Sequence, residues 1–141
     1  MSNPSPGERL LELTIPAQPD RLRFVHHVMR DAADLSGCSE RTIEDIVIAV
    51  NEACMNIIQH GYAGGDGTII VTVDRHTDHL DIRLTDFCAK VDPAKLKSRD
   101  LDDIRPGGLG VHLIGETMDE TRFLTPPPGA GNLLQMTKKI S

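Results

Sequence analysis

The chain of 141 residues has a net charge of −6, with 39% hydrophobic, 26% charged and 3% aromatic residues. This composition is typical of a single globular domain, and the acidic balance with few aromatic rings argues against a nucleic-acid partner. No apolar run is long enough for a membrane helix. Three cysteines without a C-x-x-C spacing and an N-terminus without a secretory signal favour a cytoplasmic protein that has no disulfide framework.

Hydrophobic periodicity and turn residues predict an α+β protein with helices packed on one sheet. The predicted elements, in chain order, are a strand over 10–15, helices over 21–36 and 40–60, strands over 68–73 and 80–85, a helix over 111–118, and strands over 121–124 and 133–140. Asp20 and Ser39 are the expected caps of the first two helices. We expect residues 1–8 to form a flexible tail and residues 9–141 to form a single domain.

The long second helix carries three polar residues on one face. Glu52, Asn56 and His60 follow each other at intervals of four and lie off the apolar stripe. A carboxylate and an amide one turn apart can hold a metal ion or polarise a nucleophile. An ordinary solvated helix face has the same pattern, so the spacing alone leaves both interpretations open.

Asp86 follows the strand over 80–85 and has the parity of its apolar residues, so its carboxylate is predicted to face the core. Burying a carboxylate is costly unless it is paired. One interpretation is an acceptor for an amine or amide donor inside a pocket. The other is a cap for the turn at the end of the strand.

Residues 87–106 lack periodicity and are rich in charge, which predicts a long functional loop. The loop ends in a glycine-rich turn, Arg105 to Gly110, directly before the predicted helix over 111–118. Glycines at a helix start let backbone N–H groups approach an anion, and an arginine can add a phosphate contact. Hinges have the same composition, so this turn alone is weak evidence.

Taken in this order, the three motifs resemble those of the GHKL ATPase superfamily, which has the Bergerat nucleotide-binding fold. Residues 49–62 are similar to its N box, Asp86 stands where the aspartate of the G1 box falls, and residues 105–110 are similar to the G2 box. The resemblance covers the chain from about Leu13 to Ile140. It is closest to the small anti-sigma-factor serine kinases of bacterial partner-switching systems. The implied fold is an α+β sandwich whose helices pack on one face of a mixed, mostly antiparallel sheet.

The resemblance implies ATP and Mg²⁺ as cofactors. It makes Glu52 the general base for an incoming serine hydroxyl, Asn56 the Mg²⁺ ligand, and Asp86 the acceptor for the adenine amino group. It makes the loop over 87–106 an ATP lid. The residues implied near the phosphates are Arg105, Gly108 and Gly110. This short list is chemically sufficient, because phosphoryl transfer is mostly positioning and charge stabilisation.

The implied activity is that of an ATP-dependent serine-protein kinase and anti-sigma factor. It would phosphorylate a serine of an anti-sigma-factor antagonist, sequester a sigma factor and form a homodimer. The charge distribution suits such a partner, since residues 1–70 carry 5 basic and 10 acidic residues. An acidic surface favours a basic protein patch, as on a DNA-binding sigma factor, over direct contact with DNA.

Two residues depart from the family motifs. Cys88 stands where the G1 box has glycine, and Asn132 replaces the usual threonine near the last strand. A side chain at position 88 is expected to crowd the adenine or stiffen the start of the lid. Cys88 therefore favours an alternative: a non-catalytic binding module of the same fold that sequesters its partner without efficient kinase activity. A structural domain with an ordinary polar surface is the third interpretation, which the order of the motifs disfavours.

Overall fold

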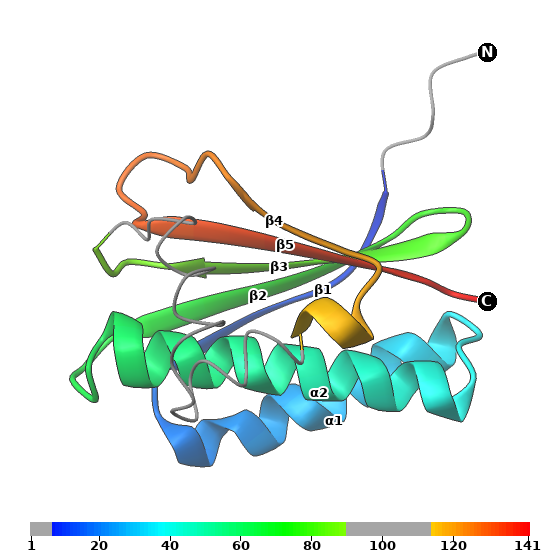
Figure 1. The fold of residues 1–141 in the computed structure, drawn as a ribbon, viewed down its shortest axis with the longest axis horizontal. Coiled ribbons are helices and arrows are strands. Elements are labelled where there is room, and N and C mark those ends of the chain that lie inside the picture. The colour runs from blue at the N-terminus through cyan, green and yellow to red at the C-terminus, as the bar shows by residue number, and fades with distance from the viewer. Residues whose placement is uncertain (1–6, 90–113) are drawn as a thin grey trace.

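Alternating apolar side chains build one sheet in the computed structural model, which describes residues 7–89 and 114–141 (Figure 1). The strands are β1 (Glu8–Pro16), β2 (Thr68–Arg75), β3 (His79–Asp86), β4 (Glu120–Leu124) and β5 (Asn132–Lys139). They lie in the order β1-β2-β3-β5-β4, and every pairing between these described strands is antiparallel. The expected α+β sandwich is confirmed.

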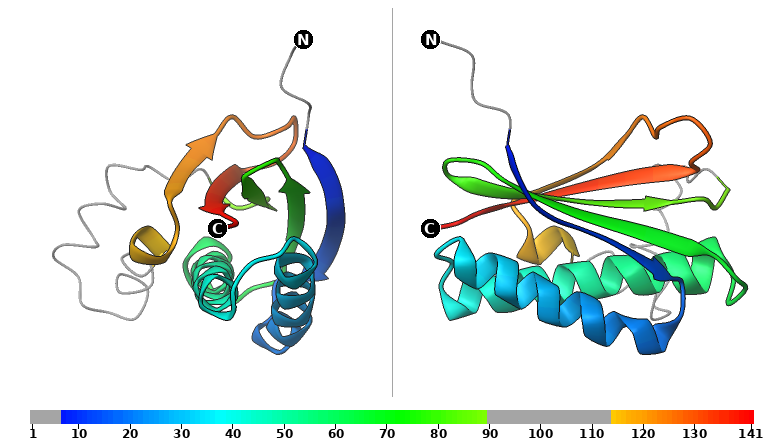
Figure 2. Two further views of the ribbon diagram at one scale, coloured as in Figure 1. Left: turned by 90° about the vertical axis from the view of Figure 1, so that its right-hand side faces the viewer. Right: turned by 180° about the vertical axis from the view of Figure 1, so that it is seen from behind.

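Two helices cover one face of this sheet, α1 (Leu22–Leu35) and α2 (Glu40–Asn56), and lie side by side beneath it (Figure 2). The core between the two layers is formed by side chains with almost no exposed surface: Val25, Met29, Ile46, Val50, Ile69, Val71, Ile82, Leu84 and Met136. No helix of the described residues is long and apolar enough to span a membrane.

The predicted capping residue is confirmed for α2 and is wrong for α1. The Ser39 hydroxyl accepts a hydrogen bond from the Thr42 amide at 3.2 Å, which is the expected cap. Asp20 caps no helix, because Pro19–Arg21 forms a separate 3-10 turn, η1, before α1 begins at Leu22. The proline at the first position of this turn fixes its backbone, and Asp20 lies inside the turn instead of preceding the helix.

The last turn of the long helix also differs from the expected α-helix. After Asn56 the backbone widens into a π-helical turn, η2 (Ile57–Gly61). The even four-residue spacing that placed His60 in line with Glu52 and Asn56 therefore ends at Asn56. Such widened turns are rare and occur frequently at functional sites.

Near the C-terminal end, residues 114–117 form the described part of the helix expected over 111–118. Lys138 on β5 connects this short helix to α2, because its ammonium group lies 3.2 Å from the Asp45 carboxylate and donates to the Thr117 carbonyl at 2.5 Å. The expected start of that helix and most of the loop over 87–106 lie outside the described residues.

Candidate functional site

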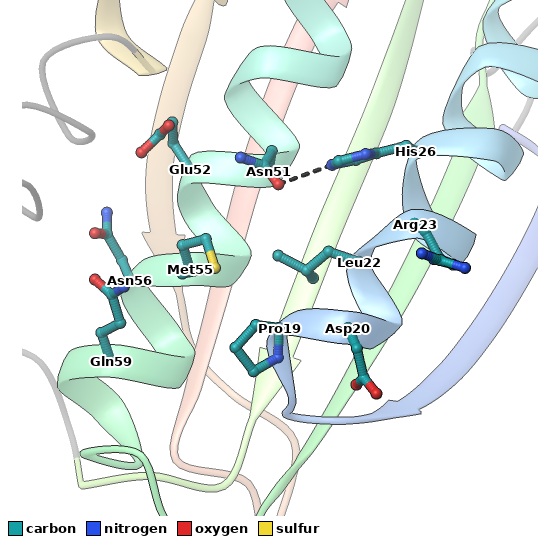
Figure 3. Close-up of a pocket in the computed structure, with 10 residues that line it drawn as sticks. All are labelled: Pro19, Asp20, Leu22, Arg23, His26, Asn51, Glu52, Met55, Asn56 and Gln59. Carbon is teal, nitrogen blue, oxygen red and sulfur yellow. Dashed lines mark hydrogen bonds between the residues drawn. The ribbon is translucent and has the colours of Figure 1, made fainter.

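A groove of about 560 Å³ separates the start of α1 from the end of α2 (Figure 3). From the first segment it is lined by Pro19, Asp20, Leu22, Arg23 and His26. From α2 it is lined by Asn51, Glu52, Met55, Asn56 and Gln59. Two of the predicted site residues, Glu52 and Asn56, thus share one groove and project from the same side of α2. His60 is not among the lining residues.

The Glu52 carboxylate is half-buried and receives no hydrogen bond or ion pair from the described residues. The Asn56 amide lies one turn further along, also half-buried and on the groove. An amide oxygen beside a carboxylate suits Mg²⁺, which usually keeps several waters and takes only one or two protein ligands beside substrate phosphates. The described part of the chain holds no group of three or more His, Cys, Asp or Glu able to bind a metal ion. A one- or two-ligand Mg²⁺ site does not require such a group.

The neighbouring Asn51 side chain links α2 to α1. Its side-chain oxygen lies 2.7 Å from Nε2 of His26 on α1, as the dashed line in Figure 3 shows. This hydrogen bond links the two helices beside Glu52. The Asn51 side chain is therefore committed to the fold, whereas that of Glu52 is available to a ligand or substrate.

Asp86 lies at the end of β3 with 5% of its surface exposed, on the same face of the sheet as Ile69 and Asn132 in the neighbouring strands. Its predicted orientation toward the core is confirmed. Oδ1 accepts hydrogen bonds from the Cys88 amide at 3.0 Å and from Nδ2 of Asn132 at 2.9 Å. The first of these is the expected cap of the strand-end turn.

The two carboxylate oxygens of Asp86 differ in the donors that they receive from the described residues. The backbone and side-chain amides of the described residues that reach the carboxylate all donate to Oδ1. Oδ2 receives no amide donor from the described residues, and the Cys88 thiol also hydrogen-bonds the Asp86 carboxylate. A lone pair of Oδ2 can accept a further hydrogen bond from a ligand. The exocyclic amino group of adenine is a donor of the required kind. The turn cap and the binding acceptor are therefore compatible in one side chain.

Cys88 connects Asp86 to the end of the long helix. A Cβ atom built on Gly61 would stand 2.5 Å from the Cys88 Sγ, and one built on Gly131 would stand 1.8 Å from the Cys88 carbonyl oxygen. Both glycines therefore permit a close approach that any side chain would prevent. Burial and then the charge of Asp86 raise the pKa of the Cys88 thiol to about 12. Its expected crowding of adenine stays a prediction.

The structure thus brings two of the three motifs together. The N box ends in η2, and Gly61 of that turn contacts Cys88, two residues after Asp86. The residues expected near the phosphates, Arg105, Gly108 and Gly110, lie outside the described residues. Tyr62 is the last residue of the N box, but sequence reasoning assigned it no role, although its hydroxyl contacts the backbone of both β2 and Phe87. The available signal was its place directly after Gly61 as the one tyrosine of the chain.

Comparison with known proteins identifies the family. Residues 15–138 match the histidine kinase-like ATPase domain. The chain belongs to this family. The serine-protein kinase RsbW of Bacillus pumilus (strain SAFR-032) is 33% identical over 144 residues, which cover 94% of this chain and 86% of the relative. The protein of the same name from Bacillus cereus (strain G9842) is 30% identical over 138 residues, covering 92% and 84%.

A solved structure supports the fold. A chain in the crystal structure of the SiaB-SiaC complex from Pseudomonas aeruginosa has a TM-score of 0.61 and 19% sequence identity, and the similarity covers 95% of this chain and 92% of that chain. The resemblance deduced from the motifs is therefore confirmed at the level of the ATPase domain and of its serine-protein kinase relatives.

Proposed function

We propose that this histidine kinase-like ATPase domain is an ATP- and Mg²⁺-dependent protein-serine kinase. The observation that carries the proposal is the half-buried Glu52 carboxylate, which has no partner among the described residues and lines an open groove beside Asn56. A half-buried carboxylate on an open groove, without a described partner, can accept a proton from a bound substrate. The two RsbW relatives are named serine-protein kinases, which favours phosphoryl transfer over other ATP-dependent reactions.

Glu52 accepts the proton of the serine hydroxyl in the proposed reaction. Its open groove admits the protein segment that carries the serine, while Asn51 and His26 hold the adjacent helix in place. Asn56 supplies an amide oxygen to Mg²⁺. When bound, ATP would supply the phosphoryl group, and Mg²⁺ would neutralise the charge that develops on its oxygens.

Asp86 accepts a hydrogen bond from the adenine amino group through its second oxygen. We assign Arg105, Gly108 and Gly110 to the phosphates on the basis of their motif alone. The unit that carries these roles is proposed to be a single domain over residues 9–141 in the cytoplasm.

The proposed substrate is a serine on an anti-sigma-factor antagonist, and the competing partner is a sigma factor. The groove is lined by two acidic residues, Asp20 and Glu52, and by the basic Arg23. Met55 adds an apolar surface to it. The solved SiaB-SiaC complex is an example of this fold in a protein complex. We also propose a homodimer, as in the family that the motifs resemble.

One feature favours a second candidate function. Cys88 occupies the glycine position of the G1 box, and its thiol lies beside Asp86, the proposed base acceptor. If this side chain prevents tight ATP binding, the chain acts as a binding module that sequesters its partner without efficient catalysis.

Calorimetric titration with ATP and Mg²⁺, followed by an assay of phosphotransfer to the antagonist, distinguishes the kinase from the non-catalytic binding module. Micromolar binding with transfer to a serine is the expected result. Absence of binding at millimolar nucleotide, with the sigma factor still captured, would select the binding module. A partner switch further requires that sigma factor and antagonist compete for the immobilised protein, and simultaneous capture of both would contradict it.

A further inference from the structure

The segment that follows Asp86 is held by a residue outside the assigned site. The backbone amide of Phe87 donates a hydrogen bond to the Tyr62 hydroxyl at 2.9 Å. The same hydroxyl donates to the carbonyl of Thr68, the first residue of β2, at 2.7 Å. One oxygen atom therefore joins the end of the N box, the start of β2 and the exit from β3.

The tyrosine ring has little freedom to move. A Cβ atom built on Gly67 would lie 2.3 Å from the ring, so the ring packs directly on the glycine backbone. Burial raises the pKa of Tyr62 above its ordinary value, and the hydroxyl therefore keeps the proton that it donates to Thr68. The hydroxyl oxygen is consequently a fixed acceptor for the Phe87 amide.

The next two residues after Phe87 are held in turn. The Cys88 amide donates to Oδ1 of Asp86, and the Ala89 carbonyl accepts from Nδ2 of Asn132 at 3.0 Å. The Asp86 carbonyl accepts from the Gly131 amide at 2.8 Å. Since Phe87 lies between Asp86 and Cys88, a displaced Phe87 amide shifts the donor that orients the Asp86 carboxylate.

We infer that Tyr62 is a positioning residue for base recognition, which holds the turn after β3 so that Asp86 presents Oδ2 to the amino group of the purine. The inference rests on the proposed nucleotide site. The ring, which covers Gly67, serves the fold. The hydroxyl serves the specificity of the site, because its acceptor contact orients the turn on which the carboxylate depends.

Tyr62→Phe tests this inference, because it removes one oxygen atom and keeps the ring. The probes are ATP and the purine riboside triphosphate that lacks the 6-amino group, each titrated with Mg²⁺ into the full chain. The parent should prefer ATP by about tenfold, the value of one hydrogen bond to a charged acceptor. Tyr62→Phe should reduce this preference to about twofold by weakening ATP binding, with the affinity for the other nucleotide unchanged.

Thr85→Val is the matched control. It also removes one hydroxyl beside Asp86, but the alternation of β3 places this side chain on the opposite face of the sheet, so the preference should stay at the parental value. Asn132→Val is the second variant, which removes the side-chain donor to Asp86 and to Ala89 and should also reduce the preference. It keeps the test open if Tyr62→Phe fails to fold.

The outcomes distinguish the inference from the proposed function. If Tyr62→Phe keeps the parental preference, or weakens both nucleotides equally, the positioning role is overturned while the nucleotide site stands. If the parent binds neither nucleotide, or binds both equally, the assigned role of Asp86 is wrong and the inference fails with it. A reduced preference in both variants, with Thr85→Val unchanged, supports the inference.

Discussion

Two aspartates on β3 are buried to the same extent and have different surroundings. Asp81 and Asp86 each expose 5% of their surface, on opposite faces of the sheet. Both oxygens of Asp81 are paired, since the Arg83 guanidinium lies 3.2 Å from each of them and Gln135 donates to Oδ2 at 2.8 Å. Asp86 receives two neutral donors on one oxygen.

The difference fits the two roles that we propose, in folding for Asp81 and in ligand binding for Asp86. The hydrogen bonds from the Arg83 guanidinium and the Gln135 amide replace the water that the Asp81 carboxylate loses on burial. Asp86 has no charged partner among the described residues, and its second oxygen can accept a hydrogen bond from a ligand. Glu52 extends the same contrast to α2, where a half-buried carboxylate lacks any described partner.

The largest expected effect concerns Glu52. Glu52→Gln keeps the shape of the side chain and removes the base, so phosphotransfer to the antagonist should slow by about 10²–10⁴. Calorimetry should give the parental ATP affinity, because the proposed role is in transfer rather than binding. Glu44→Gln, two turns earlier on α2 and exposed, is the control and should transfer at the parental rate. A parental rate in Glu52→Gln would refute the role of general base.

Asp86→Asn should weaken ATP binding by about 1–3 kcal/mol, or about five- to 150-fold in the dissociation constant. The remaining amide oxygen can still accept from Cys88, so the turn is retained. The unfolding free energy should change less than the binding free energy. Equal ATP affinities of the variant and the parent would contradict the proposed acceptor.

Asp81→Asn should show the reverse pattern. Removing the charge leaves the Arg83 guanidinium without its partner, and urea unfolding should give a loss of about 1–2 kcal/mol with ATP affinity unchanged. Asp78→Asn, in the exposed β2–β3 hairpin, is the control and should leave the unfolding midpoint in place. A loss of nucleotide affinity in Asp81→Asn, as large as in Asp86→Asn, would remove the distinction between the two aspartates.

The smallest effect tests the contact beside Asp86. Gly61→Ala brings a methyl group against the Cys88 thiol and should destabilise the fold by about 1 kcal/mol. Cys88→Gly provides the missing space, so the double variant should recover about 0.5–1 kcal/mol relative to the sum of the single changes. Cys88→Gly alone should tighten ATP binding, because the side chain at position 88 is expected to crowd the adenine. An unchanged ATP dissociation constant would show instead that the thiol, which lies against Gly61, leaves the base site free.

Local patterns predicted most of the elements. The alternation in residues 68–73 and 80–85 located β2 and β3 to within two residues at either end, and Ser39 marked the start of α2. The parity of Asp86 predicted its face correctly, since a strand fixes side-chain direction by position alone. The motif around residues 49–62 predicted the family for the same reason: its spacing is local.

Properties that depend on distant contacts were not predictable. Asp81 has the parity of an outward-facing residue, and its burial requires Gln135, 54 positions away. The π-helical turn after Asn56 brings Gly61 to Cys88, a contact that helical periodicity does not contain. Tyr62 acts through a backbone amide 25 positions later, and such donors leave no mark in the side-chain pattern.

The three cysteines have a consequence for how the protein tolerates oxidants. Burial raises the pKa of Cys54 to about 12 and that of Cys38 above its ordinary value, and Cys88 is also held near 12 beside Asp86. Peroxides and electrophiles react with the thiolate rather than the thiol. All three sulfurs therefore stay protonated near neutral pH, including the one at the proposed base site. We therefore expect the three thiols to react slowly with such reagents at neutral pH.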